Sequence, residues 1–299
     1  MLDVLGDAAA QLGALDGRFL FAALLLQLAT LGFRALAWRS VLAAAYPDRR
    51  IPVGAVAGAY AAGVALNAFT PARGGEVAKV VLIRARIPGS TLTTVAASLS
   101  VILTLDAVLG ASLIVGLWAA GLLPATPPSV GVLPVGVAAG VVVVAILALR
   151  LRWRLARTLL VRVTQGVRVL RTPGRYLRTV LPFQLAAWAC RVGVAFLVLS
   201  AFRIEAGLTT AALVVVLNGL STAVPVPGGI GTQQVLAAYA LRGVAPLAGA
   251  VSFSLTMQVG VTVVNTLIGM IAMMLMLRTY RPVAALRSSL ALVRSQRAG

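Results

Sequence analysis

The chain has 299 residues, of which 60% are hydrophobic and only 11% are charged. Soluble globular proteins are about half apolar and about a quarter charged, so this composition excludes an ordinary soluble fold. The 26 basic and 7 acidic residues give a formal net charge of +19, but no basic, aromatic-rich soluble module accompanies them, and nucleic-acid binding is not expected.

Apolar stretches long enough to cross a bilayer recur along the chain and predict an all-α integral membrane protein with seven or eight transmembrane helices. In chain order they cover residues 18–43, 52–70, 91–121, 131–149, 179–201, 207–224 and 246–277. The N-terminus lacks the basic start of a secretory signal, so the first stretch is expected to be a retained helix.

The distribution of arginine predicts the side of the membrane on which each loop lies. Residues 150–178 contain nine arginines and no acid, whereas 122–130 carry no charge. The positive-inside rule therefore places 150–178 in the cytoplasm and 122–130 outside. Counting back places the N-terminus inside as well. The basic tail after 277 fits the rule only if residues 231–243 form an eighth crossing, and we expect that they do. The whole chain is expected to be a single multi-pass domain of the plasma or inner membrane.

A proline-glycine breaker occurs twice and indicates an internal repeat. Both copies fit P-x-x-G-G, one over 71–75 and one over 225–229, which are 154 residues apart. Chance predicts roughly 0.1 such matches in a chain of this composition. The same offset relates two halves, about 18–121 and 179–277, joined by the helix at 131–149 and the basic loop at 150–178.

Matched breaks in two halves point to a binding site of the kind that transporters build. Proline removes a backbone donor and paired glycines weaken a helix, so such breaks persist at membrane depth only where protein or water surrounds them. Each break is therefore expected to be re-entrant, and the two are expected to meet around a polar groove. The alternative is a pair of ordinary helix ends at the membrane surface.

The candidate substrate-binding residues are the breakers themselves and the polar residues around them. They are Asn67, Pro71, Arg73, Gly74, Gly75, Glu76, Lys79, Asp106, Asn218, Pro225, Pro227, Gly228, Gly229, Gln233 and Gln234. With no histidine and one cysteine in the chain, we expect no catalytic histidine, no metal site and no cofactor.

Charged side chains within this set suggest how a lipid would be held. Arg73 and Lys79 are expected to bind a phosphate, and Glu76 to receive a positive headgroup or to hold Arg73. Asp106 lies in the middle of an apolar span, where Arg34 and Arg191 are candidate counter-ions. A structural ion pair, a proton-coupled carboxylate and a group that handles a charged headgroup are all open for Asp106.

Two segments resemble hallmarks of the lysylphosphatidylglycerol synthase transmembrane (flippase-like) family. The first is Asn-Ala-Phe-Thr-Pro-Ala-Arg-Gly-Gly-Glu-Val-Ala-Lys at 67–79, and the second is Pro-Val-Pro-Gly-Gly-Ile-Gly-Thr-Gln-Gln at 225–234. Asp106 falls where the family commonly has an acid. The family often carries a glutamate near Gln234, which is absent here. The resemblance implies a stand-alone member without an aminoacyl-transferase domain.

The resemblance implies a lipid translocase that moves a phospholipid, an aminoacyl-lipid or a polyprenyl-linked or glycolipid substrate between leaflets. Its expected partners are membrane lipids, either anionic phospholipids or a lipid-linked substrate, and a lipid or glycan synthase. One alternative is a membrane-embedded transferase in which Glu76 or Asp106 acts as general base. Another is a non-catalytic membrane partner of a cell-envelope synthase.

Overall fold

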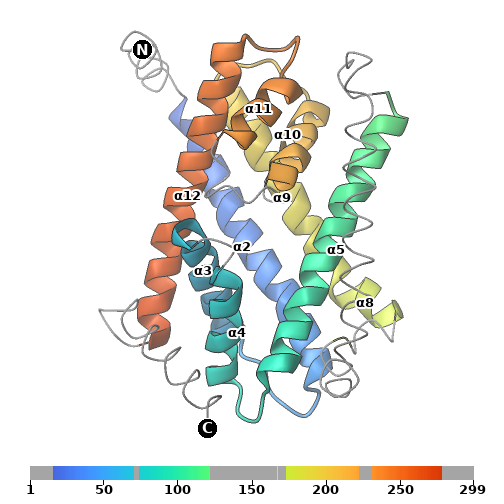
Figure 1. Cartoon of the computed structure of the whole chain (residues 1–299), viewed down its shortest axis with the longest axis vertical. Helices are drawn as coiled ribbons and strands as arrows, with labels where there is room; N and C mark the ends of the chain where they lie inside the picture. The colour runs from blue at the N-terminus through green and yellow to red at the C-terminus, as the bar shows by residue number, and fades with distance from the viewer. Residues whose placement is uncertain (1–15, 71–73, 122–166, 168–172, 222–230, 278–299) are drawn as a thin grey trace. The chain divides into compact units, whose positions relative to one another are not determined.

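The structure is a computed structural model, and it describes residues 16–70, 74–121, 167, 173–221 and 231–277. These residues form α-helices and no strand, as the long apolar stretches predict (Figure 1). In chain order the helices are α2 (Gly17–Ala45), α3 (Val53–Phe69), α4 (Gly74–Arg86), α5 (Leu92–Ala119), α8 (Pro173–Thr179), α9 (Leu181–Ala201), α10 (Leu208–Ser221), α11 (Thr232–Ala240) and α12 (Leu247–Leu277).

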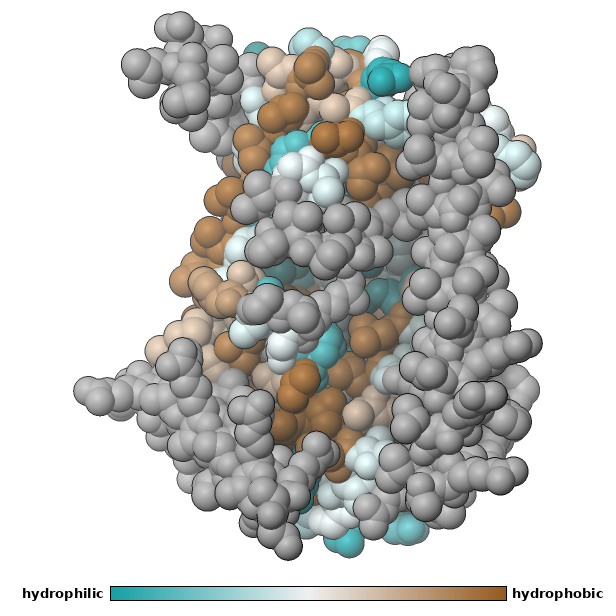
Figure 2. Space-filling model, viewed as in Figure 1, coloured by the Kyte–Doolittle hydropathy of each residue, from teal (hydrophilic) through white to brown (hydrophobic). Residues whose placement is uncertain are grey.

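Four of the described helices are long and apolar enough to cross a membrane, namely α2, α5, α9 and α12. At a rise of about 1.5 Å per residue, each exceeds the roughly 30 Å of a hydrocarbon core. Large aliphatic side chains along α12, such as Val259, Val263 and Leu267, are half or more exposed. Figure 2 shows apolar atoms along this helix. Such a surface suits acyl chains rather than water, so a multi-pass membrane protein is confirmed.

The helices on either side of the two breaks are short. α3 and α10 have 17 and 14 residues, and α4 and α11 have 13 and 9. A nine-residue helix rises only about 14 Å, less than half of a bilayer core. α11 is therefore too short to cross by itself, and the eighth crossing expected over residues 231–243 stays a prediction. The predicted helix at 131–149 lies outside the described residues.

The helix order of the first half recurs in the second. In the first half, the long helix α2 and the short helix α3 precede the break, and the short helix α4 and the long helix α5 follow it. In the second half, α9 and α10 precede the break and α11 and α12 follow it, with the same alternation of long and short helices. α10 and α12 begin 155 residues after α3 and α5, α11 begins 158 residues after α4, and α9 begins 164 residues after α2. The division into two repeat halves stays a prediction, and this order supports it.

The chain divides into two compact units that do not coincide with the halves. Unit 1 takes the described residues of 1–26, 100–164 and 191–256, and unit 2 those of 27–99, 165–190 and 257–299. Unit 2 contains the α3–α4 pair and unit 1 contains the α10–α11 pair.

In unit 2, α3 and α4 form a helical hairpin that returns to the end where it began. The backbone N–H of Thr91, just before α5, donates to the Tyr46 hydroxyl, just after α2, at 3.2 Å. Arg49 in the α2–α3 loop lies beside Gly89 in the α4–α5 loop. The end of α2 and the start of α5 are thus neighbours, although 46 residues separate the two helices.

Candidate functional site

The α3–α4 hairpin of unit 2 is held by a close approach of two glycines. A Cβ atom on Gly75 would overlap the carbonyl oxygen of Gly63, and one on Gly63 would lie 2.7 Å from the carbonyl oxygen of Gly75. Neither position has room for a side chain. Gly75 of the sequence motif is therefore required by the packing of α4 on α3, whatever else it does.

Asn67, near the end of α3, connects the two helices through both ends of its amide. Its Oδ1 accepts a hydrogen bond from the backbone N–H of Gly75 at 2.9 Å, and its Nδ2 donates to Glu76 Oε1 at 3.0 Å. The first bond satisfies one of the N–H groups that the first turn of a helix leaves without an intrahelical partner. The second orients the carboxylate of Glu76.

Glu76 and Lys79 form a buried ion pair one turn apart on α4. Lys79 Nζ lies 2.8 Å from Glu76 Oε1, and the side chain of Lys79 is only 3% exposed. The same ammonium lies 4.3 Å from the centre of the Tyr60 ring on α3, a cation–π distance. Lys79 is thus occupied by a carboxylate and an aromatic face. The expectation that Lys79 binds a lipid phosphate stays a prediction, and in this structure its ammonium is enclosed by these two partners.

The second carboxylate oxygen of Glu76 differs from the first in its hydrogen bonding. Oε2 is buried and accepts no hydrogen bond from the described residues. An ionised carboxylate can accept about four hydrogen bonds, and here both of the bonds found go to Oε1. A buried acceptor without a donor costs about 1–3 kcal/mol. The geometry therefore presents a fixed, one-sided acceptor at the start of α4.

α12 supports this hairpin along one side, as Figure 1 shows. A Cβ on Gly269 would lie within van der Waals overlap of Ala61 and Ala65 on α3, and one on Gly58 would meet the side chain of Met276. Small residues let helix backbones approach closely in membranes. Beside Gly58, at the open end of the hairpin, the guanidinium of Arg86 donates to the carbonyl oxygen of Met276 in the last turn of α12.

In unit 1, Asp106 of α5 pairs with Arg191 of α9, one of the two counter-ions proposed from the sequence. Arg191 Nη1 and Asp106 Oδ2 are 3.9 Å apart, at the limit of an ion pair. The two side chains are 24% and 21% exposed, so both are partly accessible.

The second motif is described only in part. Gln234 Oε1 accepts a hydrogen bond from the N–H of Gly231 at 2.6 Å, which caps the start of α11. Gly231 has a φ of +88°, a conformation that favours glycine. Gln234 thus has a local structural role. Asn218 on α10 and Gln233 on α11 are partly buried.

Several predicted site residues lie outside the described residues. They are Pro71, Arg73, Pro225, Pro227, Gly228 and Gly229. The described site residues fall into two sets. Unit 2 brings Asn67, Gly74, Gly75, Glu76 and Lys79 together, and unit 1 contains Asp106, Asn218, Gln233 and Gln234. A shared groove between the two breaks stays a prediction.

Sequence reasoning missed four residues that the structure makes important. Tyr60 and Gly63 belong to the hairpin core, and a small or aromatic residue in an apolar helix gives no separate signal. Gln27 on α2 donates to Asn265 on α12 at 2.8 Å, an interhelical amide pair in unit 2. Polar residues within apolar spans are a usable signal for such bonds.

Comparison with known proteins gives one match. The sequence model of a family described as the lysylphosphatidylglycerol synthase TM region matches residues 5–269. The chain belongs to this family. No curated protein and no solved structure matches the chain.

Membership of the lysylphosphatidylglycerol synthase TM family indicates a membrane protein of lipid or envelope metabolism. The matched region includes both proline-glycine breaks and all four long described helices up to the last part of α12. The resemblance inferred from the two motifs is therefore confirmed at the level of the family.

Proposed function

We propose that the chain is a flippase-like lipid translocase, which moves a phospholipid, an aminoacyl-lipid or a polyprenyl-linked or glycolipid substrate between leaflets. The observation that carries this proposal is the one-sided carboxylate of Glu76 in the α3–α4 hairpin. Ionisable residues within membrane segments are rare, and they mark substrate or ion pathways by default.

The free oxygen of Glu76 suits a hydrogen-bond donor on a lipid headgroup. Asn67 and Lys79 hold the other oxygen, so the carboxylate cannot turn away to satisfy itself. An ammonium or hydroxyl donor of the substrate would remove the cost of the orphaned acceptor while it is bound. In this proposal the affinity for the lipid differs between conformations of the hairpin that expose Oε2 and conformations that do not. Alternating access requires such a difference in affinity.

A phosphate needs a positive partner, and Lys79 is already used. Arg73 precedes α4 by one residue in the sequence and offers a bidentate guanidinium. In this proposal the guanidinium of Arg73 supplies that positive partner.

Purified protein in liposomes with a headgroup-labelled lipid tests the proposal. We expect leaflet exchange without any covalent change in the lipid. A new product would instead support the transferase, and neither exchange nor product would support the partner role.

Glu76→Gln should abolish exchange of lipid between leaflets, but it also leaves the buried ammonium of Lys79 without its counter-ion. The double variant Glu76→Gln/Lys79→Met removes both charges together and preserves the shape of the pair. It should fold and still fail to exchange lipid. Exchange at the wild-type rate by a folded double variant would refute the site. Gly54→Ala, in α3 with open space around a new Cβ, serves as the control.

A further inference from the structure

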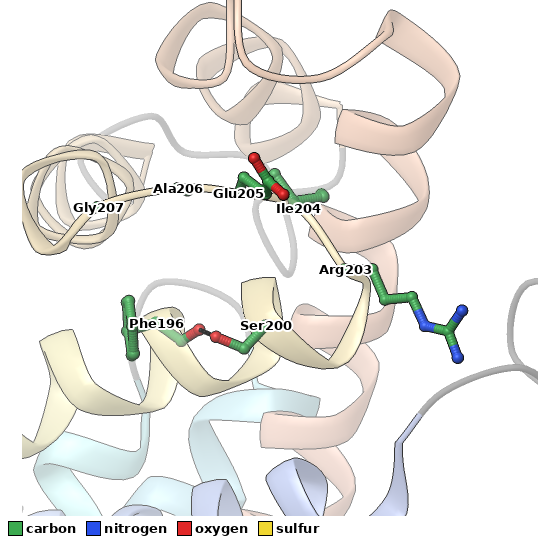
Figure 3. A pocket seen from close by; sticks show the side chains of 7 residues that line it. All are labelled: Phe196, Ser200, Arg203, Ile204, Glu205, Ala206 and Gly207. Carbon is green, nitrogen blue, oxygen red and sulfur yellow. Dashed lines mark hydrogen bonds between the residues drawn. The ribbon is translucent and has the colours of Figure 1, made fainter.

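A separate cavity lies in unit 1 at the turn between α9 and α10. It is an open depression in the surface, with a volume of about 520 Å³. The residues that line it come from the last turns of α9 and from the connecting turn (Figure 3), and they are Phe196, Ser200, Arg203, Ile204, Glu205, Ala206 and Gly207.

Two opposite charges border this cavity. Arg203 and Glu205 are both exposed and are two residues apart. In Figure 3 their side chains point in different directions. Within the part of the chain that the structure describes, neither side chain makes a hydrogen bond or an ion pair, so the two charges do not neutralise one another. Each is available to a ligand.

The backbone at Arg203 is unusual. Among the described residues it is the one non-glycine with a positive φ, at 55°. Its N–H bonds the carbonyl oxygen of Ser200, and the N–H of Ile204 bonds that of Leu199. These two bonds form a Schellman motif at the end of α9, in which the left-handed position is most often glycine. An arginine there is strained, and observed strain motivates a functional hypothesis.

The depth of the cavity suits a lipid headgroup. α9 has 21 residues and rises about 31 Å, so a helix that crosses the bilayer ends near the headgroup region. Phe196 and Ile204 give the cavity an apolar side. The hydroxyl of Ser200 donates to the carbonyl oxygen of Phe196 at 3.0 Å, so its proton is not offered to a ligand.

We infer that this cavity binds the headgroup of a zwitterionic phospholipid, with the phosphate on Arg203 and the ammonium on Glu205. An anionic lipid satisfies Arg203 but leaves Glu205 facing negative charge. A lipid with both groups satisfies both residues. The inference requires a membrane protein but not translocation, so it goes beyond the proposed function.

Native mass spectrometry of the purified protein, titrated with lipid, tests this site. Two probes are compared, namely phosphatidylethanolamine and its N-acetyl derivative, which keeps the phosphate and lacks the positive charge. Arg203→Gly should weaken binding of both probes about tenfold, as expected for loss of a charge-assisted contact. Glu205→Gln should weaken binding of phosphatidylethanolamine alone and remove the preference between the two.

The variants are chosen so that misfolding cannot imitate the result. Glycine is favoured in the left-handed conformation, so Arg203→Gly should unfold at or above the wild-type temperature. Arg242→Gln removes a positive charge elsewhere in unit 1 and should bind both probes as the wild type does. Wild-type binding by Arg203→Gly, equal losses for both probes in Glu205→Gln, or an equal loss in Arg242→Gln would overturn the inference.

Discussion

At the scale of the residue, two ion pairs among the described residues differ in how deeply the basic side chain is buried. Glu76 and Lys79 are in hydrogen-bond contact and are 20% and 3% exposed, whereas Asp106 and Arg191 are 3.9 Å apart and are 21% and 24% exposed. A buried pair costs desolvation whether or not it stabilises the fold, so removal of one partner is more damaging than removal of both. The two pairs should therefore respond differently to substitution.

For the tight pair, Glu76→Gln alone should lower the free energy of unfolding by about 3–5 kcal/mol, because it leaves the ammonium of Lys79 buried without a counter-ion. Adding Lys79→Met should recover most of this loss. Thermal or denaturant unfolding of the single and double variants in detergent measures both. Additive losses in the double variant would show that the two residues do not act as a pair.

For the pair in α5 and α9, Asp106→Asn should lower the free energy of unfolding by less than Glu76→Gln does, because the remaining guanidinium of Arg191 is partly exposed and not enclosed. Exchange of labelled lipid should nevertheless fall in this variant if the pair handles a charged headgroup. Wild-type exchange in liposomes, with unchanged unfolding, would leave Asp106 with no role in transport.

At the scale of the element, the α3–α4 hairpin depends on glycine rather than on apolar bulk. The backbones approach so closely at Gly63 and Gly75 that no Cβ fits. The amide of Asn67 bridges the two helices and satisfies the N–H of Gly75 where α4 begins. This packing holds the helices on either side of the break together and keeps Glu76 in one orientation.

Gly75→Ala should destabilise the protein by about 1–3 kcal/mol or more, since the new methyl overlaps backbone rather than a movable side chain. Gly54→Ala on the same hairpin meets nothing within 4 Å. It should be neutral or stabilising by up to about 1 kcal/mol, because alanine is the better helix former. Equal stabilities for the two variants, measured by unfolding, would contradict the close approach.

At the scale of the whole molecule, the hairpins change the expected topology. If α3 and α4 enter and leave on one side, the loops at 46–52 and 87–91 lie together, and Arg49, Arg50, Arg84 and Arg86 lie at the same end of the hairpin. The positive-inside rule then makes that end cytoplasmic. α2 is about 43 Å long at 1.5 Å per residue and crosses completely, so its N-terminal end would lie outside. This differs from the topology counted from the sequence.

The basic tail then fits without an eighth crossing. Phe202 after α9 packs edge-to-face on Phe253 of α12, with ring centres 6.1 Å apart, so α10 and α11 also return to the end where they began. In chain order, the crossings are then α2, α5, the predicted helix at 131–149, α9 and α12. An odd number of crossings from an outside N-terminus brings the tail after 277 into the cytoplasm.

Single cysteines in a Cys190→Ser background test this topology. Asp16→Cys, before α2, should react with a membrane-impermeant maleimide in intact cells, and Asp48→Cys, after α2, should react only once the cells are opened. Both positions are exposed. The reverse pattern would restore the N-terminus to the inside, as the arginine count alone predicts.

The sequence by itself determined the membrane class, the long helices, the repeated break and the family, because these depend on composition, local periodicity and short motifs. It also limited the counter-ions of Asp106 to Arg34 and Arg191, since few charges lie inside apolar spans, and the structure selects Arg191. Only the tertiary structure showed that Lys79 is paired with Glu76 and the ring of Tyr60, and that the backbones of Gly63 and Gly75 touch. It also showed that α4 folds back on α3 and α11 on α10. Those outcomes depend on which faces of neighbouring helices meet, and hydrophobic periodicity carries no information about that when a helix is apolar on every side.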